Sequence, residues 1–158
     1  MQTLAFRPFK NPNGNYILLL HTAEAPATSE WLDYVTAVQA LLADSTAMVR
    51  AFVATDGGSS NAIQRRLLAD AVMRGTQMHT HVFTSDLFIR SVVTAFSWIA
   101  KPGATAHAPW EFSKVCESCG VALPDLAREL QDLQKSFPKV MTLERMLDSA
   151  KQRSPDHA

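Results

Sequence analysis

A glycine-rich turn between a strand-like run and a helix-like run is the first feature whose residue types suit chemistry. It reads Asp56-Gly57-Gly58-Ser59-Ser60-Asn61, and Arg65 and Arg66 follow in the predicted helix. Such a turn presents backbone N–H groups and the positive end of the helix dipole, which suit an anion or a phosphate on a ligand or on a serine. The alternative is a tight turn in which Ser59 or Ser60 caps the helix.

The same turn supplies the residue types of a small hydrolase or phosphoryl-transfer enzyme, with Asp56, Ser59 or Ser60, and His81 as acid, nucleophile and base. The chain contains no Gly-x-Ser-x-Gly sequence, which marks the strained nucleophile turn of many hydrolases. The turn also matches neither Gly-x-x-x-x-Gly-Lys-Ser/Thr nor Gly-x-Gly-x-x-Gly, so no nucleotide cofactor is predicted. An enzyme is therefore the alternative to a binding function, and we predict no catalytic residue.

Histidines and cysteines form a second group of candidate residues. His79 and His81 are two apart on a predicted strand and so share one face, where His107 or the Cys116/Cys119 pair would complete a metal site. However, Cys-x-x-Cys supplies half of a zinc site, and the sequence has no second pair. Both cysteines also fall on the apolar stripe of a predicted helix. We therefore predict buried core cysteines, ordinary sheet histidines and no metal.

Apolar runs and turn residues predict the elements that must position these residues. An Asn-Gly turn predicts an N-terminal hairpin, and the next strands alternate with helices. In the helix after the glycine-rich turn, Ile63, Leu67 and Ala71 form the predicted inward face, and Gly75 is its predicted C-terminal cap. The predicted strands are residues 4–9, 15–22, 49–55, 78–84 and 104–107.

This order predicts an α/β fold with a central mixed, mostly parallel sheet of about five strands, covered by about four to five helices. The N-terminal hairpin supplies the antiparallel edge. Residues 1–122 form the predicted α/β domain, residues 123–151 a C-terminal helical extension, and residues 152–158 a disordered tail.

The C-terminal extension has an apolar stripe that needs a partner surface. Leu126, Leu130, Leu133 and Phe137 recur at helical spacing, Pro138 follows them, and a short final helix comes next. One interpretation is that this stripe covers a face of its own domain. The other is an assembly face that forms a homodimer or binds another protein.

Composition limits the classes of function. The 158 residues contain 15 basic and 15 acidic side chains, so no global field attracts nucleic acid or an anionic membrane. The longest apolar run, residues 16–20, is too short to span a bilayer, and the first residues do not resemble a signal peptide. With two cysteines, a disulfide framework is not expected either. These features predict a cytoplasmic protein.

The layout resembles that of STAS-type, SpoIIAA-like domains, the fold of bacterial anti-sigma-factor antagonists. The similarity covers residues 15–121: the strand Tyr16 to Thr22, the helix Ser29 to Leu42, the strand Val49 to Thr55 with its Asp-Gly-Gly-Ser-Ser turn, the strand Met78 to Thr84, and the stretch from Lys101 into the helix at Pro109. In that family an Asp followed directly by a phosphorylatable Ser occupies this turn. Asp56 matches the Asp, whereas Gly57 and Gly58 separate it from Ser59 and Ser60.

The resemblance implies a non-enzymatic binding or regulatory module that recognises a partner protein, and occasionally a small molecule. Its binding or regulatory loop would comprise Asp56 to Asn61 with Arg65 and Arg66, and would be switched by a phosphate on Ser59 or Ser60. The sequence does not identify the partner or the ligand.

Overall fold

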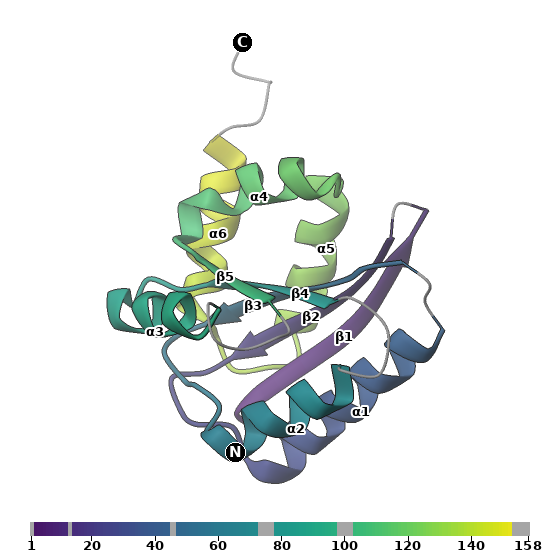
Figure 1. Ribbon diagram of the computed structural model, residues 1–158. Helices are drawn as coiled ribbons and strands as arrows, with labels where there is room; N and C mark the ends of the chain where they lie inside the picture. The colour runs from purple at the N-terminus through teal and green to yellow at the C-terminus, as the bar shows by residue number, and fades with distance from the viewer. Residues whose placement is uncertain (1, 13, 45–46, 73–77, 98–102, 153–158) are drawn as a thin grey trace.

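The computed structural model describes residues 2–12, 14–44, 47–72, 78–97 and 103–152. Within these residues, helices lie on both faces of one central sheet (Figure 1). The predicted tail residues 153–158, the predicted cap Gly75, and Lys101 and Pro102 lie outside the described residues.

The sheet has the strand order β1-β2-β3-β4-β5. β1 runs antiparallel to β2, and each later strand runs parallel to its neighbour, so the predicted mixed α/β sheet with an N-terminal hairpin is confirmed. The strands are β1 (Leu4–Asn11), β2 (Gly14–His21), β3 (Val49–Thr55), β4 (Met78–Phe83) and β5 (Gly103–His107).

The helices divide between the two faces (Figure 1). α1 and α2 cover one face, α4, α5 and α6 cover the other, and α3 lies beside β5 at the end of the sheet. Their bounds are α1 (Thr28–Ala43), α2 (Ala62–Val72), α3 (Leu87–Ser97), the 3-10 turn η1 (Pro109–Glu111), α4 (Phe112–Cys119), α5 (Leu123–Gln134) and α6 (Met141–Gln152).

Two hydrophobic clusters hold the layers together. Alternate residues of β2 point to opposite faces. Ile17 and Leu19 pack with α1 and α2, whereas Leu18 and Leu20 pack with α4, α5 and α6. Burial on both faces explains why β2 reads as a continuous apolar run in the sequence.

The C-terminal helices belong to one of these clusters. Leu126, Leu130, Leu133 and Phe137 are all buried, in the same cluster as Leu18 and Phe52 of the sheet. Of the two interpretations of this stripe, the structure shows the first, in which it covers the chain's own sheet. The four side chains are buried against the chain's own sheet, and the assembly face stays a prediction.

None of the helices in the described parts of the chain has the length and apolar character needed to cross a bilayer.

Candidate functional site

The turn after β3 is held in shape by Thr55. The hydroxyl of Thr55 donates to the carbonyl of Gly58 at 3.0 Å and accepts from the backbone N–H of Gly57 at 3.2 Å. Gly57 has φ +124°, a conformation that side chains disfavour. A Cβ on Gly58 would lie 2.2 Å from both the carbonyl oxygen of Glu24 and the Cε1 atom of His21. Both glycines are therefore required by the backbone path.

The first turn of α2 is capped by Asn61, and not by Ser59 or Ser60 as one of the two interpretations of the turn expected. The Asn61 Oδ1 atom accepts from the N–H of Gln64 at 2.8 Å, and the Gln64 Oε1 atom accepts from the N–H of Asn61 at 2.9 Å. This reciprocal pair is a capping box, with Asn in place of Ser or Thr. The two serines consequently precede the cap, and no described hydrogen bond assigns their hydroxyls to it.

The capping box also corrects the prediction that Ile63 lies on the inward face of α2, whereas Ala71 packs against the core as predicted. Gln64 is buried, and its amide donates to the carbonyl of Pro26 at 2.9 Å. The backbone carbonyl of Gln64 accepts from the indole N–H of Trp31 at 2.7 Å. Because these contacts turn Gln64 inward, its neighbour Ile63 points to solvent and is 73% exposed. The spacing of apolar residues alone therefore placed Ile63 on the wrong face of α2.

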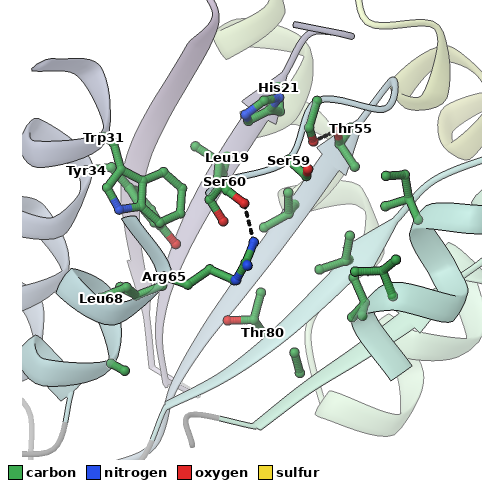
Figure 2. Close-up of a pocket in the computed structure, with 18 of the residues that line it drawn as sticks. Leu19, His21, Trp31, Tyr34, Thr55, Ser59, Ser60, Arg65, Leu68 and Thr80 are labelled. Atoms are coloured by element: carbon green, nitrogen blue, oxygen red, sulfur yellow. Dashed lines mark hydrogen bonds between the residues drawn. The ribbon is translucent and has the colours of Figure 1, made fainter. Parts of the chain in front are cut away.

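A cavity of about 430 Å³ opens between α2 and α3, over the face of the sheet that α1 and α2 cover. Figure 2 shows its lining side chains converging from strands, helices and the turn after β3. Trp31 and Tyr34, whose ring centroids are 5.4 Å apart, form an aromatic wall. The apolar lining residues are Leu19, Trp31, Tyr34, Val53, Ala62, Leu68, Ala69, Val82, Ile89, Val92, Val93 and Ala104.

The polar groups of the cavity come mainly from the predicted loop. Gly58, Ser59, Ser60, Arg65 and Arg66 all line it. The Arg65 side chain extends across the opening in Figure 2, and its guanidinium donates to the backbone carbonyl of Ser60. Among the described lining residues, the two arginines carry the only formal charges at neutral pH.

His21 lies at one end of the cavity and is 3% exposed. Its Nδ1 atom lies 2.9 Å from the carbonyl oxygen of Thr22, and because a carbonyl only accepts, the ring proton is on Nδ1. The Nε2 lone pair is buried without a partner among the described residues. Burial lowers the pKa of His21, opposed by the Thr22 carbonyl and the Glu30 carboxylate, so the imidazole is neutral at neutral pH.

Asp56, the first residue of the predicted loop, does not line this cavity. Its carboxylate accepts from the backbone N–H groups of Met141 and Thr142, each at 2.8 Å, at the start of α6. The Thr142 hydroxyl donates to the carbonyl of Thr55 at 2.9 Å. The predicted loop therefore divides into a part that anchors α6 and a part that lines the cavity.

A separate cluster on the opposite face of the sheet contains His79, His81, His107 and Cys119. The His81 Nδ1 atom lies 3.0 Å from His107 Nε2, and its Nε2 atom lies 3.5 Å from the Cys119 sulfur. His79 packs edge-on against His81, with ring centroids 4.7 Å apart. His79 and His81 therefore share one face, as predicted, while Cys119 packs at the edge of the core.

Burial is the main reason that the pKa of each of these three imidazoles is lowered. Burial, and then His79, His107 and Arg50, lower the pKa of His81 to about 4. Burial also raises the pKa of the Cys116 thiol to about 12. Within the described residues, no group of three or more His, Cys, Asp or Glu side chains is arranged to hold a metal ion.

The residues of the alternative hydrolase do not converge. His81 stacks on Phe52 on one face of the sheet, while Ser59 and Ser60 line the cavity on the other. Asp56 is hydrogen-bonded to the start of α6. Acid, nucleophile and base are thus separated by the sheet and by the capping contact.

Sequence reasoning missed most of the cavity wall. Thr80 and Val82 of β4 and Ile89, Val92 and Val93 of α3 all line it. The sequence predicts these elements, but it does not predict that α2 and α3 stand apart over the sheet. The available sequence signal was the consecutive apolar run Leu87, Phe88 and Ile89, which is wider than one buried helix face.

Comparisons of the chain with protein-family models, with curated proteins and with solved structures found no significant match. The resemblance to STAS-type domains therefore rests on the order of elements.

Proposed function

We propose that this protein is a non-enzymatic binding module that holds a small, largely apolar molecule in the cavity between α2 and α3. The observation that carries the proposal is the cavity of about 430 Å³, which falls within the range of roughly 300–1,000 Å³ found for small-ligand pockets. Its lining also has the usual composition of such a pocket, with mostly apolar and aromatic side chains and a few polar groups.

The position of the cavity supports the same proposal. In open α/β sheets, ligands bind beyond the carboxyl ends of the strands. Here His21 and Thr55, the last residues of β2 and β3, line the cavity together with Ser59 and Ser60 of the following turn. Of the loop predicted from the sequence, Gly58, Ser59, Ser60, Arg65 and Arg66 thus contribute to the cavity, whereas Asp56, Gly57 and Asn61 do not.

The wall around the turn is pre-organised. Trp31 is fixed by its bond to Gln64, and Gln64 is fixed in turn by Asn61 and Pro26. A pocket formed before the ligand arrives costs less conformational entropy on binding than one that the ligand must order. This favours a binding site over a packing defect.

A neutral fluorescent probe, N-phenyl-1-naphthylamine, tests the proposal, because its emission rises in apolar surroundings. Val92→Trp places a large ring in the cavity, whereas Ser91→Trp adds the same ring at an exposed position of α3. We expect saturable binding to the wild-type protein, weakened about tenfold or more by Val92→Trp and unchanged by Ser91→Trp. Equal affinities for both variants, or no saturable binding, would contradict the proposal.

A second candidate function is contact with a regulatory protein partner through the same loop. Ile63, Leu87 and Phe88 are 73%, 71% and 73% exposed at the starts of α2 and α3, so each offers apolar surface to a protein partner. A phosphate on Ser59 or Ser60 would lie beside Arg65 and switch such a contact. Pull-down with wild-type bait and with Ile63→Asp bait, followed by mass spectrometry of both proteins, tests this candidate. A partner retained equally by both baits would argue against it.

A further inference from the structure

The charges of the cavity point to the chemical class of its ligand. Resting on the proposed binding function, we propose that the ligand is an amphipathic monocarboxylate. Its carboxylate is held by Arg65 and Arg66 at the start of α2, and its apolar body lies over β2, β3 and β4, between α2 and α3.

The first support is charge. Arg65 and Arg66 line the cavity, and no described acidic side chain does. The chain as a whole has a formal net charge of zero, so this positive lining is a local feature. Cations beside low-dielectric walls concentrate their field on a bound anion.

The second support is the direction of α2. This helix is 11 residues long, and Ser59, Ser60 and Ala62 at its N-terminal end line the cavity with the arginines. The positive end of the helix dipole therefore adds to the guanidinium charges. The Ser59 and Ser60 side chains add hydroxyl groups at the same place, since Asn61 takes the capping role that either serine would otherwise have.

The third support is the shape of the apolar part. Leu19 and Val53 form the floor from neighbouring strands, and Leu68 of α2 faces Ile89 and Val93 of α3 across it. An apolar chain or ring in this space keeps its carboxylate at the arginine end. Transfer of a doubly charged phosphate into such an apolar lining costs more desolvation free energy than transfer of one carboxylate, which favours the carboxylate.

Arg65 has a further role that shapes the test. Its guanidinium already contacts the Ser60 carbonyl, so it orders the turn in addition to its proposed ligand contact. Arg65→Gln keeps an amide donor for that carbonyl and removes the charge. Arg66 is exposed, and Arg66→Gln removes a charge without altering a described hydrogen bond.

The experiment is displacement of N-phenyl-1-naphthylamine by ligands that share one chain and differ in the head group: decanoate, decanol, decyl phosphate and decyltrimethylammonium. For the wild-type protein we expect decanoate to displace the probe at a concentration about tenfold lower than decanol, with decyltrimethylammonium weakest. For Arg65→Gln/Arg66→Gln we expect decanoate and decanol to become nearly equal, with the affinity for decanol unchanged. Arg66→Gln alone should give an intermediate preference, and it remains informative if the double variant unfolds.

The matched control is Arg128→Gln/Lys135→Gln, which removes the same net charge from exposed side chains on the opposite side of the sheet. It should leave the preference for decanoate unchanged. Equal displacement by decanoate and decanol in the wild-type protein would overturn the carboxylate assignment while leaving the binding function intact. A preference for decyl phosphate would replace carboxylate with phosphate. Failure of the probe itself to bind would overturn the proposed function as well.

Discussion

The carboxylate of Asp56 accepts a hydrogen bond of 2.8 Å from the backbone N–H of Thr142, a residue 86 positions later in the chain. A second N–H, that of Met141, donates to the same carboxylate. The loop after β3 thereby caps the last helix, and this contact ties the C-terminal extension to the edge of the cavity-forming turn.

Removal of this cap should destabilise the protein without changing the ligand affinity of the folded protein. We expect Asp56→Ala to lower the free energy of unfolding by about 1–2 kcal/mol, because two helix N–H groups lose a charged acceptor. Urea denaturation measures the change. Asp125→Ala is the control, since Asp125 makes an exposed ion pair with Arg128 and should cost less than about 1 kcal/mol. Equal decreases in the free energy of unfolding for the two substitutions would show that the Asp56 cap contributes no more than an exposed ion pair.

The C-terminal stripe should behave as core. Leu130 is 1% exposed in the cluster beneath α5, so Leu130→Ala should cost about 2–5 kcal/mol, and Leu130→Asp should unfold the sheet. Circular dichroism with urea denaturation measures both effects. Leu87→Ala at an exposed position should change stability by less than about 0.5 kcal/mol. If the wild-type protein is an oligomer and Leu130→Asp is a folded monomer, the result would support the assembly face instead.

The turn at the cavity should not accept a side chain at Gly58. A Cβ there would lie 2.2 Å from backbone and from the His21 ring, so Gly58→Ala should cost about 1–3 kcal/mol and weaken probe binding. Gly14→Ala is a milder control, because its Cβ would lie 3.1 Å from its nearest neighbour, the Tyr16 hydroxyl, and not 2.2 Å. Urea denaturation and probe titration on the same samples give both quantities. Wild-type behaviour of Gly58→Ala would contradict the close packing of His21 on this turn.

The histidine cluster should make stability depend on pH. Burial and the neighbours His79, His107 and Arg50 lower the pKa of His81 to about 4 from an ordinary 6.5. Above pH 6.5 the ring is neutral in both the folded and the unfolded chain. As the pH falls below 6.5, the unfolded chain takes up the proton first, so the free energy of unfolding decreases down to about pH 4.

His81→Phe keeps an aromatic ring beside Phe52 and removes this titration. Urea denaturation across that pH range should show a shallower decrease for His81→Phe than for the wild-type protein. The slope is compared, because loss of the contacts with His107 and Cys119 also changes stability at every pH. An NMR titration in which His81 of the folded protein is protonated near its ordinary pKa of 6.5 would show that this ring is not the cause of the pH dependence.

The sequence predicts the layers because each depends on local patterns. The apolar run of β2, the Asn-Gly turn and the helical spacing of Leu126, Leu130 and Leu133 are all readable within a few residues. The structure confirms the resulting sheet. By contrast, the acceptor role of Asp56 depends on a helix more than eighty residues away. No local pattern contains such a contact.

The cavity was predictable only in part. The glycine-rich turn correctly indicates where residues gather at the end of β3, and Arg65 and Arg66 do line the cavity. Ile63 was wrongly placed on the inward face of α2, because the hydrogen bonds of buried Gln64 to Asn61 and Pro26 outweigh the burial of Ile63, whereas Ala71 packs against the core as predicted. The opening itself depends on the separation of two helices, a tertiary distance that periodicity does not encode.

Binding of a carboxylate in the cavity between α2 and α3 is tested most directly by an amide NMR titration of the wild-type protein with decanoate. We expect saturable chemical-shift changes at the amides of Ser59, Ser60 and Arg65 and at Thr80 on the cavity floor, with little change at Cys119 on the opposite face. Shifts centred on His81 and Cys119, or no saturable shifts at the turn after β3, would contradict it.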